Sequence, residues 1–345
     1  MNMRNEKHNV AVQDAPRLAA GSFTGKIMKD VSSIKVSIVM PLYNKEFYVL
    51  RAVKSALEQT YSNFELIIID DGSTDNGPDL VRKISDDRIV LISQLNKGVS
   101  AARNAGIKIA KAEWIAFLDA DDEWLPIHLE ECLHILDVNP GLIWCCAAFK
   151  RRPLHENKYR TVHYPLSIPN HIIEDFCTAD GIYEFAWTSV MVIQREVIID
   201  LGGFDETLRH GEDKFLWFKI GLHYPQIGYV NKIHATYWST EGSLTNKFTK
   251  IIASEIVALI DKYEDYLDDQ PMGIVERARS FVNSLRWRAA KESLKYDSRD
   301  SAINIYKKYG SNLSFMKRTT LIILMNLPQK FRLALHNIKS LFTPW

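Results

Sequence analysis

The sequence predicts an α/β protein built on a mostly parallel sheet that is covered by helices on both faces. Between residues 35 and 118, four short apolar segments alternate with helix-like segments at a spacing of roughly 25 residues. The apolar segments are continuous rather than alternating with polar residues, as is typical of strands buried on both faces of a sheet. Apolar residues make up 46% of the 345 residues, which is enough for a sizeable core.

The alternating elements follow one another in a regular order. Runs rich in β-branched residues that end at proline or at Asp/Gly turns favour strands, and apolar residues spaced three and four apart favour helices. We therefore expect strands at 36–40, 66–69, 89–92 and 114–118, with helices at 46–59, 78–84 and 99–110 between them.

The pattern is less regular after Pro126. We expect strands at 142–149 and 185–193 with a polar loop between them, and a helix at 212–222. From about residue 248 we expect only helices, at 251–267, 274–296, 301–309 and 317–341, the last interrupted at Pro328. Three parts follow from this pattern: a flexible polar lead at 1–34, an α/β domain at 35–248 and a helical C-terminal region at 249–345.

Charge and cysteine usage exclude several classes of protein. The 43 Lys and Arg residues against 42 Asp and Glu give a net charge of +1, so nothing global indicates nucleic-acid binding. Residues 1–34 lack an apolar core of signal-peptide length, and no run approaches the ~20 apolar residues of a membrane span. We expect a cytoplasmic protein, with buried, reduced thiols rather than metal ligands or disulfides at Cys132, Cys145, Cys146 and Cys177.

An acidic turn follows the fourth expected strand, at Asp119-Ala120-Asp121-Asp122. Carboxylates this close repel one another unless a cation or hydrogen-bond donors neutralise them. Because Mg²⁺ typically takes one or two carboxylates together with substrate phosphates, the turn predicts a site for a divalent cation and a phosphorylated substrate. The alternative is a solvated turn in which Asp122 or Glu123 caps the following helix.

Two more polar loops follow the first and second expected strands. In such sheets ligands bind beyond the carboxyl ends of the strands, so all three loops should line one site. Asp70 and Asp71 could accept the imide N–H of a pyrimidine base, since a carboxylate is an acceptor only. The segment 41–44, Pro-Leu-Tyr-Asn, offers an aromatic face beside the base. The alternative is a turn in which Thr74 or Asp75 simply caps the next helix.

Two stretches, VSIVMPLYNKEFYVLRAVKSALEQTYSNFELIIIDDGSTD and NKGVSAARNAGIKIAKAEWIAFLDADDEWLP, resemble the family-2 inverting glycosyltransferases, which have the GT-A nucleotide-sugar-binding fold. The resemblance covers residues 35 to about 240. It implies transfer of a sugar from a nucleoside-diphosphate donor, expected to be a UDP-sugar, to a glycan or lipid-linked acceptor. It also implies a divalent metal, Mg²⁺ or Mn²⁺, and a place in the synthesis of surface polysaccharide, O-antigen or capsule.

The resemblance assigns roles to the motif residues. The P-x-Y-N and D-D-G-S motifs bind the nucleoside, which here implies contacts from Pro41, Tyr43, Asn44, Asp70 and Asp71. The D-x-D motif binds the ribose, the diphosphate and the metal. Asp119 should therefore lie near the ribose and diphosphate and approach the metal, and Asp121 should ligate the metal.

The family also carries an acidic pair after a G-G-F-D-E turn, found here as Glu212-Asp213. By resemblance Asp213 is the general base, and inversion does require a carboxylate to take the proton of the attacking hydroxyl. The alternative is that both are first-turn acids favoured by the helix dipole. Arg103, in A-R-N-x-G, could reach the diphosphate or pair with the strand-end acids, and Trp187 could stack on a sugar or belong to the core.

One family feature is missing from this chain. Many relatives place a metal-assisting His before a Ser-Leu pair, where this sequence has Thr240 or Glu241, and His234 lies too early to replace it.

The last 45 residues contain seven Lys and Arg and no Asp or Glu, with apolar clusters at 321–325 and 331–335. This pattern favours a peripheral contact with anionic lipid at the inner face of the cytoplasmic membrane. The alternative is a helix packed on the catalytic domain.

Two other functions compete with glycosyl transfer. An inactive GT-A scaffold would be expected to have lost the D-x-D or Glu-Asp acids, and both are present. A sugar nucleotidyltransferase would need a Gly-rich, basic triphosphate loop after the first strand, and P-L-Y-N-K-E is not one.

Overall fold

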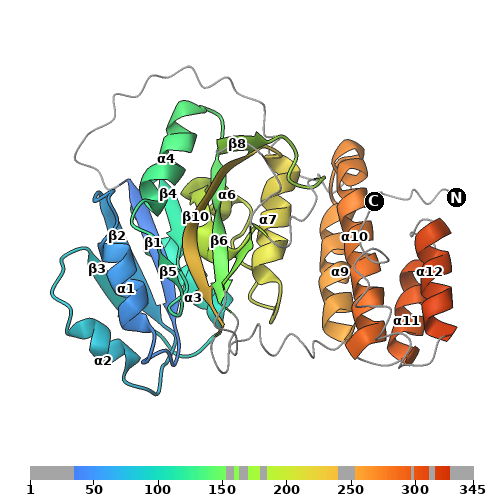
Figure 1. Cartoon of the computed structure of the whole chain (residues 1–345), viewed down its shortest axis with the longest axis horizontal. Coiled ribbons are helices and arrows are strands. Elements are labelled where there is room, and N and C mark those ends of the chain that lie inside the picture. The colour runs from blue at the N-terminus through green and yellow to red at the C-terminus, as the bar shows by residue number, and fades with distance from the viewer. Residues whose placement is uncertain are drawn as a thin grey trace, which may run out of the picture. The chain divides into compact units, whose positions relative to one another are not determined.

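The computed structural model describes residues 35–152, 159–162, 170–178, 185–239, 253–296, 299–310 and 315–326. Within them the strands form one mixed sheet in the order β3-β2-β1-β4-β9-β6-β10-β5, with β7 beside β6 and β8 beside β10 (Figure 1). The expected lead at 1–34 lies outside the described residues.

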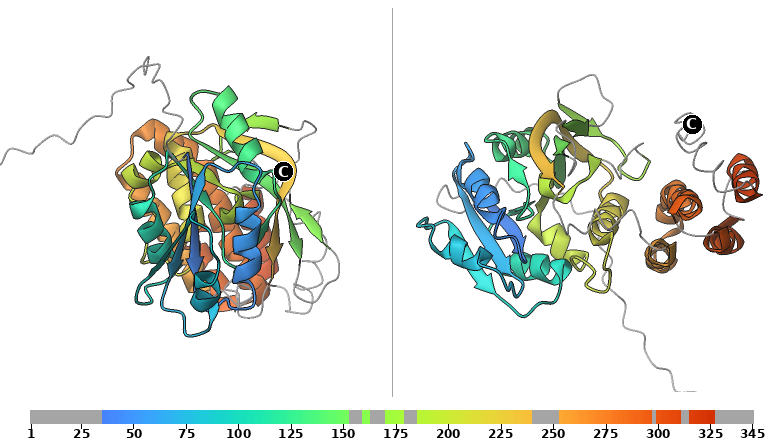
Figure 2. Two further views of the ribbon diagram at one scale, coloured as in Figure 1. Left: turned by 90° about the vertical axis from the view of Figure 1, so that its left-hand side faces the viewer. Right: turned by 60° about the horizontal axis from the view of Figure 1, so that its bottom comes forward.

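The first half of the sheet is the predicted parallel part. It consists of β1 (Val36–Leu42), β2 (Phe64–Asp70), β3 (Ile89–Ser93) and β4 (Trp114–Phe117), which pair with one another in parallel. The connecting helices are α1 (Val49–Leu57), α2 (Gly77–Arg82) and α3 (Val99–Ile109). The sheet runs between α1 on one face and α3 on the other (Figure 2), which confirms the expected α/β arrangement.

Helix α3 lies very close to the sheet because of a glycine. A Cβ at Gly106 would come within 2.6 Å of Cγ1 of Val39 on β1. A side chain at this position would therefore push the helix away from the strand, and with it every residue that α3 directs toward the end of the sheet.

The second half of the sheet departs from the expectations. The prediction of a single strand at 185–193 was wrong. The segment forms a short 3₁₀ turn, Thr188–Val190, followed by β9 (Val192–Gln194). The expected strand at 142–149 is β6 (Trp144–Arg152). Outside the main strand order, β7 (Arg160–Val162) pairs with β6 and β8 (Asn170–Ile173) pairs with β10. The longest strand, β10 (Ile227–Trp238), was not expected from the sequence, and it pairs with β5 (Glu123–Trp124).

The remaining helices complete the α/β part and continue beyond it. Helices α4 (His128–Val138), α6 (Arg195–Asp200) and α7 (Glu212–His223) belong to the α/β part, and α7 confirms the expected helix. The C-terminal helices are α9 (Ala253–Asp268), α10 (Met272–Tyr296), α11 (Arg299–Tyr309) and α12 (Phe315–Asn326). The rest of the expected last helix lies outside the described residues.

The C-terminal helices pack on the α/β part through aromatic side chains. The ring of Phe218 on α7 stacks on Phe281 of α10 at 4.8 Å and meets Tyr263 of α9 edge-on at 4.4 Å. Leu321 and Met325 of α12 are also buried, so part of the apolar cluster at 321–325 is used inside the protein. Among the described helices, none is long and apolar enough to cross a membrane.

Candidate active site

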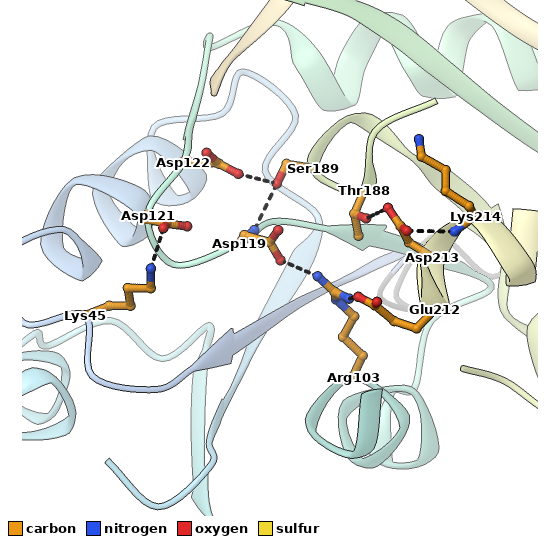
Figure 3. A network of polar contacts seen from close by, with 10 residues as sticks. All are labelled: Lys45, Arg103, Asp119, Asp121, Asp122, Thr188, Ser189, Glu212, Asp213 and Lys214. Atoms are coloured by element: carbon orange, nitrogen blue, oxygen red, sulfur yellow. Dashed lines mark hydrogen bonds and ion pairs between the residues drawn. The ribbon is translucent and has the colours of Figure 1, made fainter. Parts of the chain in front are cut away.

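Three loops meet at one edge of the sheet, where β1, β2 and β4 end. Because these strands are parallel, their carboxyl ends lie at the same edge, and the loops that follow them come together there. The first turn of α7 and the 3₁₀ turn before β9 supply further polar groups (Figure 3). The structure thus gathers residues from five separate segments into one polar network.

The acidic turn is held by a serine on the neighbouring segment. The backbone N–H of Asp119 donates to Oγ of Ser189 at 3.1 Å, and the Ser189 hydroxyl donates to Oδ2 of Asp122 at 2.8 Å. Asp122 is buried, and burial, together with repulsion from Asp121 and Asp119, raises its pKa well above the usual range. Asp122 therefore anchors the turn, while Asp119 and Asp121 remain partly exposed.

Two cationic side chains that the sequence analysis did not single out contact Asp121. Nζ of Lys45 lies 2.5 Å from Oδ2 of Asp121, and Nη2 of Arg51 donates to the Asp121 backbone oxygen at 2.6 Å. The Arg51 guanidinium lies 4.1 Å from the centre of the Trp238 ring, and burial lowers its pKa. The signal that could have identified Lys45 is its place directly after Asn44, in a loop expected to face an acidic turn.

Arg103 of α3 connects the acidic turn to the acids of α7. Its Nη2 lies 2.8 Å from Oδ1 of Asp119, and its Nη1 lies 2.9 Å from Oε1 of Glu212. The side chain is only 4% exposed, and the two carboxylates outweigh the cost of burial, so the pKa of Arg103 is raised. Of the two roles considered for Arg103, the structure contains the pairing with the acids, and a contact with the diphosphate stays a prediction.

The two acids at the start of α7 differ in their surroundings. Burial and repulsion from Asp213 raise the pKa of Glu212 to about 7, although Arg103 opposes the shift. Asp213 accepts a hydrogen bond from Oγ1 of Thr188 at 3.0 Å and another from the Lys214 backbone N–H at 2.7 Å. These two donors fix the orientation of the Asp213 carboxylate beside the network.

The carboxylates at the end of β2 are buried and organise the surrounding loops. Oδ1 of Asp70 accepts from the Ser73 backbone N–H at 2.9 Å. Asp71 accepts from the backbone N–H groups of Lys97 and Gly98, at 2.9 and 2.8 Å. The structure places both residues at the expected edge, where their hydrogen bonds shape the loops, and their contact with a nucleoside stays a prediction.

The residues after β1 lie beside this loop. Asn44 has a positive φ of 50°, and its Oδ1 accepts from the Thr74 backbone N–H at 2.8 Å, which ties the two loops together. Tyr43 is 47% exposed, so its ring is accessible to a ligand. Pro41 lies inside β1, opposite Ile69 of β2.

Trp187 and His234 both contact other ring side chains. Trp187 is half-buried and packs on Phe149 and Tyr237, with ring centres 4.7 and 5.1 Å away, which favours the core role over stacking on a sugar. His234 is fully buried on β10 and contacts His128 and Glu131 rather than the acidic turn. Thr240 and Glu241 lie outside the described residues.

The acidic turn has the chemistry of a site for a hard divalent cation. Asp119 and Asp121 offer carboxylate oxygens, and they pair with Arg103 and Lys45, respectively. Within the described part of the chain, no donor contacts Oδ2 of Asp119. The residues present therefore fit a divalent cation, provided that the cation shares the Asp121 carboxylate with Lys45 or displaces the Lys45 ammonium from it.

Comparison with known proteins gives a consistent result. Residues 37–202 match glycosyl transferase family 2. The chain is 45% identical over 103 residues to the Escherichia coli UDP-Glc:alpha-D-GlcNAc-diphosphoundecaprenol beta-1,3-glucosyltransferase WfaP, covering 30% of this chain and 41% of that protein. An uncharacterized Haemophilus influenzae glycosyltransferase is 27% identical over 298 residues, covering 84% of this chain and 96% of that protein. The chain spans only 28% to 41% of the length of the first curated relatives it matches.

Solved structures share the fold. TarS of S. aureus, in complex with UDP, superposes with a TM-score of 0.58 at 18% identity, covering 84% of this chain and 86% of that one. The mannosyltransferase PcManGT from Pyrobaculum calidifontis, in complex with GDP-Man and Mn²⁺, gives a TM-score of 0.52 at 16% identity, covering 89% and 88%. At this level of identity the likeness concerns the fold alone, and it confirms the expected GT-A architecture.

Proposed function

Because the chain belongs to glycosyl transferase family 2, we propose that it is an inverting, metal-dependent glycosyltransferase that moves a hexosyl or N-acetylhexosaminyl group from a UDP-sugar to a glycan or lipid-linked acceptor. One observation carries this proposal. Arg103 bridges Asp119 of the D-x-D turn and Glu212 of the Glu-Asp pair, so that Asp213 lies beside the network that would hold the donor. The whole set of acids that such a transfer needs is therefore assembled in one place.

The donor would bind across the ends of β1, β2 and β4. The exposed ring of Tyr43 offers a face to the base, and Asp70 and Asp71 hold the loops that would enclose the nucleoside. A uridine nucleotide is favoured because TarS has been crystallised with UDP and with UDP-GlcNAc, and because WfaP is named as using UDP-Glc.

Asp121 and Asp119 would hold the divalent cation, Mg²⁺ or Mn²⁺. When bound, the cation would neutralise the diphosphate that leaves as the sugar is transferred. Lys45 pairs with Asp121 at 2.5 Å, so its ammonium can stabilise the turn before the donor binds and then turn toward a phosphate oxygen. The solved structure of PcManGT, which shares the fold, is a complex with GDP-Man and Mn²⁺.

Asp213 would act as the general base. Its carboxylate is oriented by Thr188 and by the Lys214 backbone N–H, and would accept the proton of the acceptor hydroxyl as that hydroxyl attacks the anomeric carbon. Glu212 would keep Arg103 in place and so fix the distance between the base and the donor site.

The acceptor would be a glycan or a lipid-linked saccharide at the inner face of the cytoplasmic membrane. WfaP is named for an acceptor linked to diphosphoundecaprenol. The seven basic residues after position 300, without any acid, would favour a peripheral contact with anionic lipid. The product would be a surface polysaccharide, O-antigen or capsule.

A screen of nucleotide sugars tests this function. The purified chain is incubated with UDP-, GDP- and dTDP-sugars, with and without Mn²⁺, and thermal stabilisation and donor hydrolysis are both measured. We expect metal-dependent stabilisation by UDP and slow hydrolysis of one UDP-sugar, lost in Asp213→Asn. Binding without turnover of any donor or acceptor would instead support an inactive scaffold.

A further inference from the structure

A second group of potential metal ligands lies between α4 and β10. His128 and Cys132 are four residues apart on α4, so they lie on the same face of the helix. His234 on β10 faces them, and one ligand atom from each of the three residues lies within 4.8 Å of the others. All three side chains are fully buried. The sequence spacing did not indicate this cluster, because His234 is distant from the other two residues along the chain.

The separations in this cluster match those expected around a tetrahedral metal. Zinc binds imidazole nitrogen at about 2.0–2.1 Å and thiolate sulfur at about 2.3 Å, so tetrahedral angles place two nitrogens about 3.4 Å apart and nitrogen and sulfur about 3.6 Å apart. Nδ1 of His128 lies 3.4 Å from Nδ1 of His234 and 3.6 Å from Sγ of Cys132.

Hydrogen bonding alone accounts poorly for this arrangement. At 3.4 Å the two imidazole nitrogens are farther apart than in a good hydrogen bond. Nε2 of His128 is buried and has no partner within the described residues. The contacts of the ring with the cluster are therefore made through Nδ1, the nitrogen whose lone pair a cation between the three side chains would use.

The surroundings of His234 have the second-shell pattern of a metal site. Its other nitrogen, Nε2, lies 3.1 Å from Oε2 of Glu131, and Lys232 contacts the other oxygen of the same carboxylate. Metal-binding histidines commonly donate their second N–H to a carboxylate in this way. A Cys132 thiolate would offset one charge of a divalent cation, and the Glu131 carboxylate, which also contacts Lys232, would stabilise the metal-bound His234 imidazole.

We propose that His128, Cys132 and His234 form a structural site for a zinc-type cation, separate from the active site and not dependent on the proposed function. Nitrogen and sulfur ligands select zinc or a metal of similar softness over Mg²⁺ or Mn²⁺, which prefer oxygen. The Cys145 thiol donates to the Cys132 backbone oxygen at 3.5 Å and so lies against the same helix, outside the group of three ligands.

Such a cation would stabilise the position of residues 124–125, which follow the D-x-D turn. The Leu125 backbone N–H donates to the His234 oxygen at 2.7 Å, and the Trp124 ring lies 4.5 Å from His128. The Trp124 indole N–H in turn donates to the Ser189 backbone oxygen at 2.6 Å. The metal would therefore link α4 to β10 beside Trp124 and Leu125, the residues that follow the acidic turn.

Metal analysis of the full chain tests the proposal. The protein is purified without a metal-affinity step, and its zinc content is measured by plasma mass spectrometry. We expect about one zinc per chain, its loss in Cys132→Ser and in His234→Gln, and its retention in Cys177→Ser, another buried cysteine outside the cluster. Asp121→Asn should also retain the zinc, which separates this site from the donor site.

Cobalt provides a readout that does not depend on how well the variants fold. When Co²⁺ is exchanged into the unmutated chain, a tetrahedral site with a thiolate ligand should give a sulfur-to-cobalt charge-transfer band and intense visible bands. A folded protein that holds no zinc and shows neither band would overturn the proposal. So would zinc that persists in Cys132→Ser but is lost in Asp121→Asn.

Discussion

Nη1 of Arg103 lies 2.9 Å from Oε1 of Glu212, and the two residues are 109 positions apart in the chain. Arg103 comes from α3 on the parallel half of the sheet, and Glu212 comes from the first turn of α7. Since the other arm of the same guanidinium binds Asp119, one buried side chain sets the position of the D-x-D turn relative to the Glu-Asp pair. Planar, two-armed contacts of this kind require arginine rather than lysine.

Removing this guanidinium should destabilise the protein and stop turnover. Breaking a buried ion pair from one side typically costs about 3–5 kcal/mol, so Arg103→Met should lower the free energy of unfolding by about that amount in urea denaturation. Arg82→Met is the control: it removes the exposed pair with Asp79, which is expected to contribute less than about 1 kcal/mol. If the two variants lost equal free energies of unfolding, the buried ion pairs of Arg103 would contribute no more to stability than an exposed pair.

Glu212 should make the protein less stable as the pH rises. Burial and Asp213 raise its folded-state pKa to about 7, above the ordinary value of 4.5, so the folded state binds more protons than the unfolded state between these values. The free energy of unfolding should then fall as the pH rises through that interval. Glu212→Gln should flatten this part of the stability curve in urea denaturation, and an unaltered slope would mean that Glu212 ionises at its ordinary pKa.

Asp121→Asn should abolish metal-dependent donor binding. The amide removes the negative charge that would hold the cation, and stabilisation by a metal is worth several kcal/mol, so turnover should fall by about 10²-fold or more. Calorimetry of UDP binding with and without Mn²⁺ measures the effect, with the exposed Asp137→Asn as the control. Full activity of the unmutated enzyme in EDTA would contradict metal dependence.

Asp213→Asn should separate turnover from binding. Loss of a positioned general base typically costs 10²–10⁴-fold, so kcat should fall by about that factor while the affinity for UDP stays close to that of the unmutated protein. Thr188→Val, which removes a donor to Asp213, should have a smaller effect in the same direction. If donor affinity fell together with kcat, Asp213 would belong to the donor site instead.

The basic C-terminal segment should bind anionic membranes. Truncation after Asn326 keeps α12, whose Leu321 and Met325 are buried, and removes three of the basic residues, Lys330, Arg332 and Lys339. Each is worth about 1 kcal/mol near an anionic surface, so the truncated chain should release from phosphatidylglycerol liposomes, and salt should weaken binding of the full chain. Equal sedimentation of the two chains with these liposomes would assign any membrane contact to another surface.

Local sequence patterns were sufficient to predict the parallel half of the fold and the edge of the sheet at which the acids lie. The strands and helices between residues 36 and 117 have strong local patterns, and parallel strands necessarily bring Asp70, Asp71 and Asp119 to one edge. Strand β10 was missed because its register shifts near Val230, Ile233 and Ala235, which breaks the two-residue period that identifies a strand.

Which side chains contact one another could be learned only from the folded chain. Two groups of side chains join segments about a hundred residues apart. One is the bridge from Asp119 through Arg103 to Glu212, and the other is the cluster of His128, Cys132 and His234. Local patterns report which face of an element is buried, but not which distant residue will lie against it. That depends on the order of strands in the sheet and on how closely the helices pack on it, and therefore on the whole folded chain.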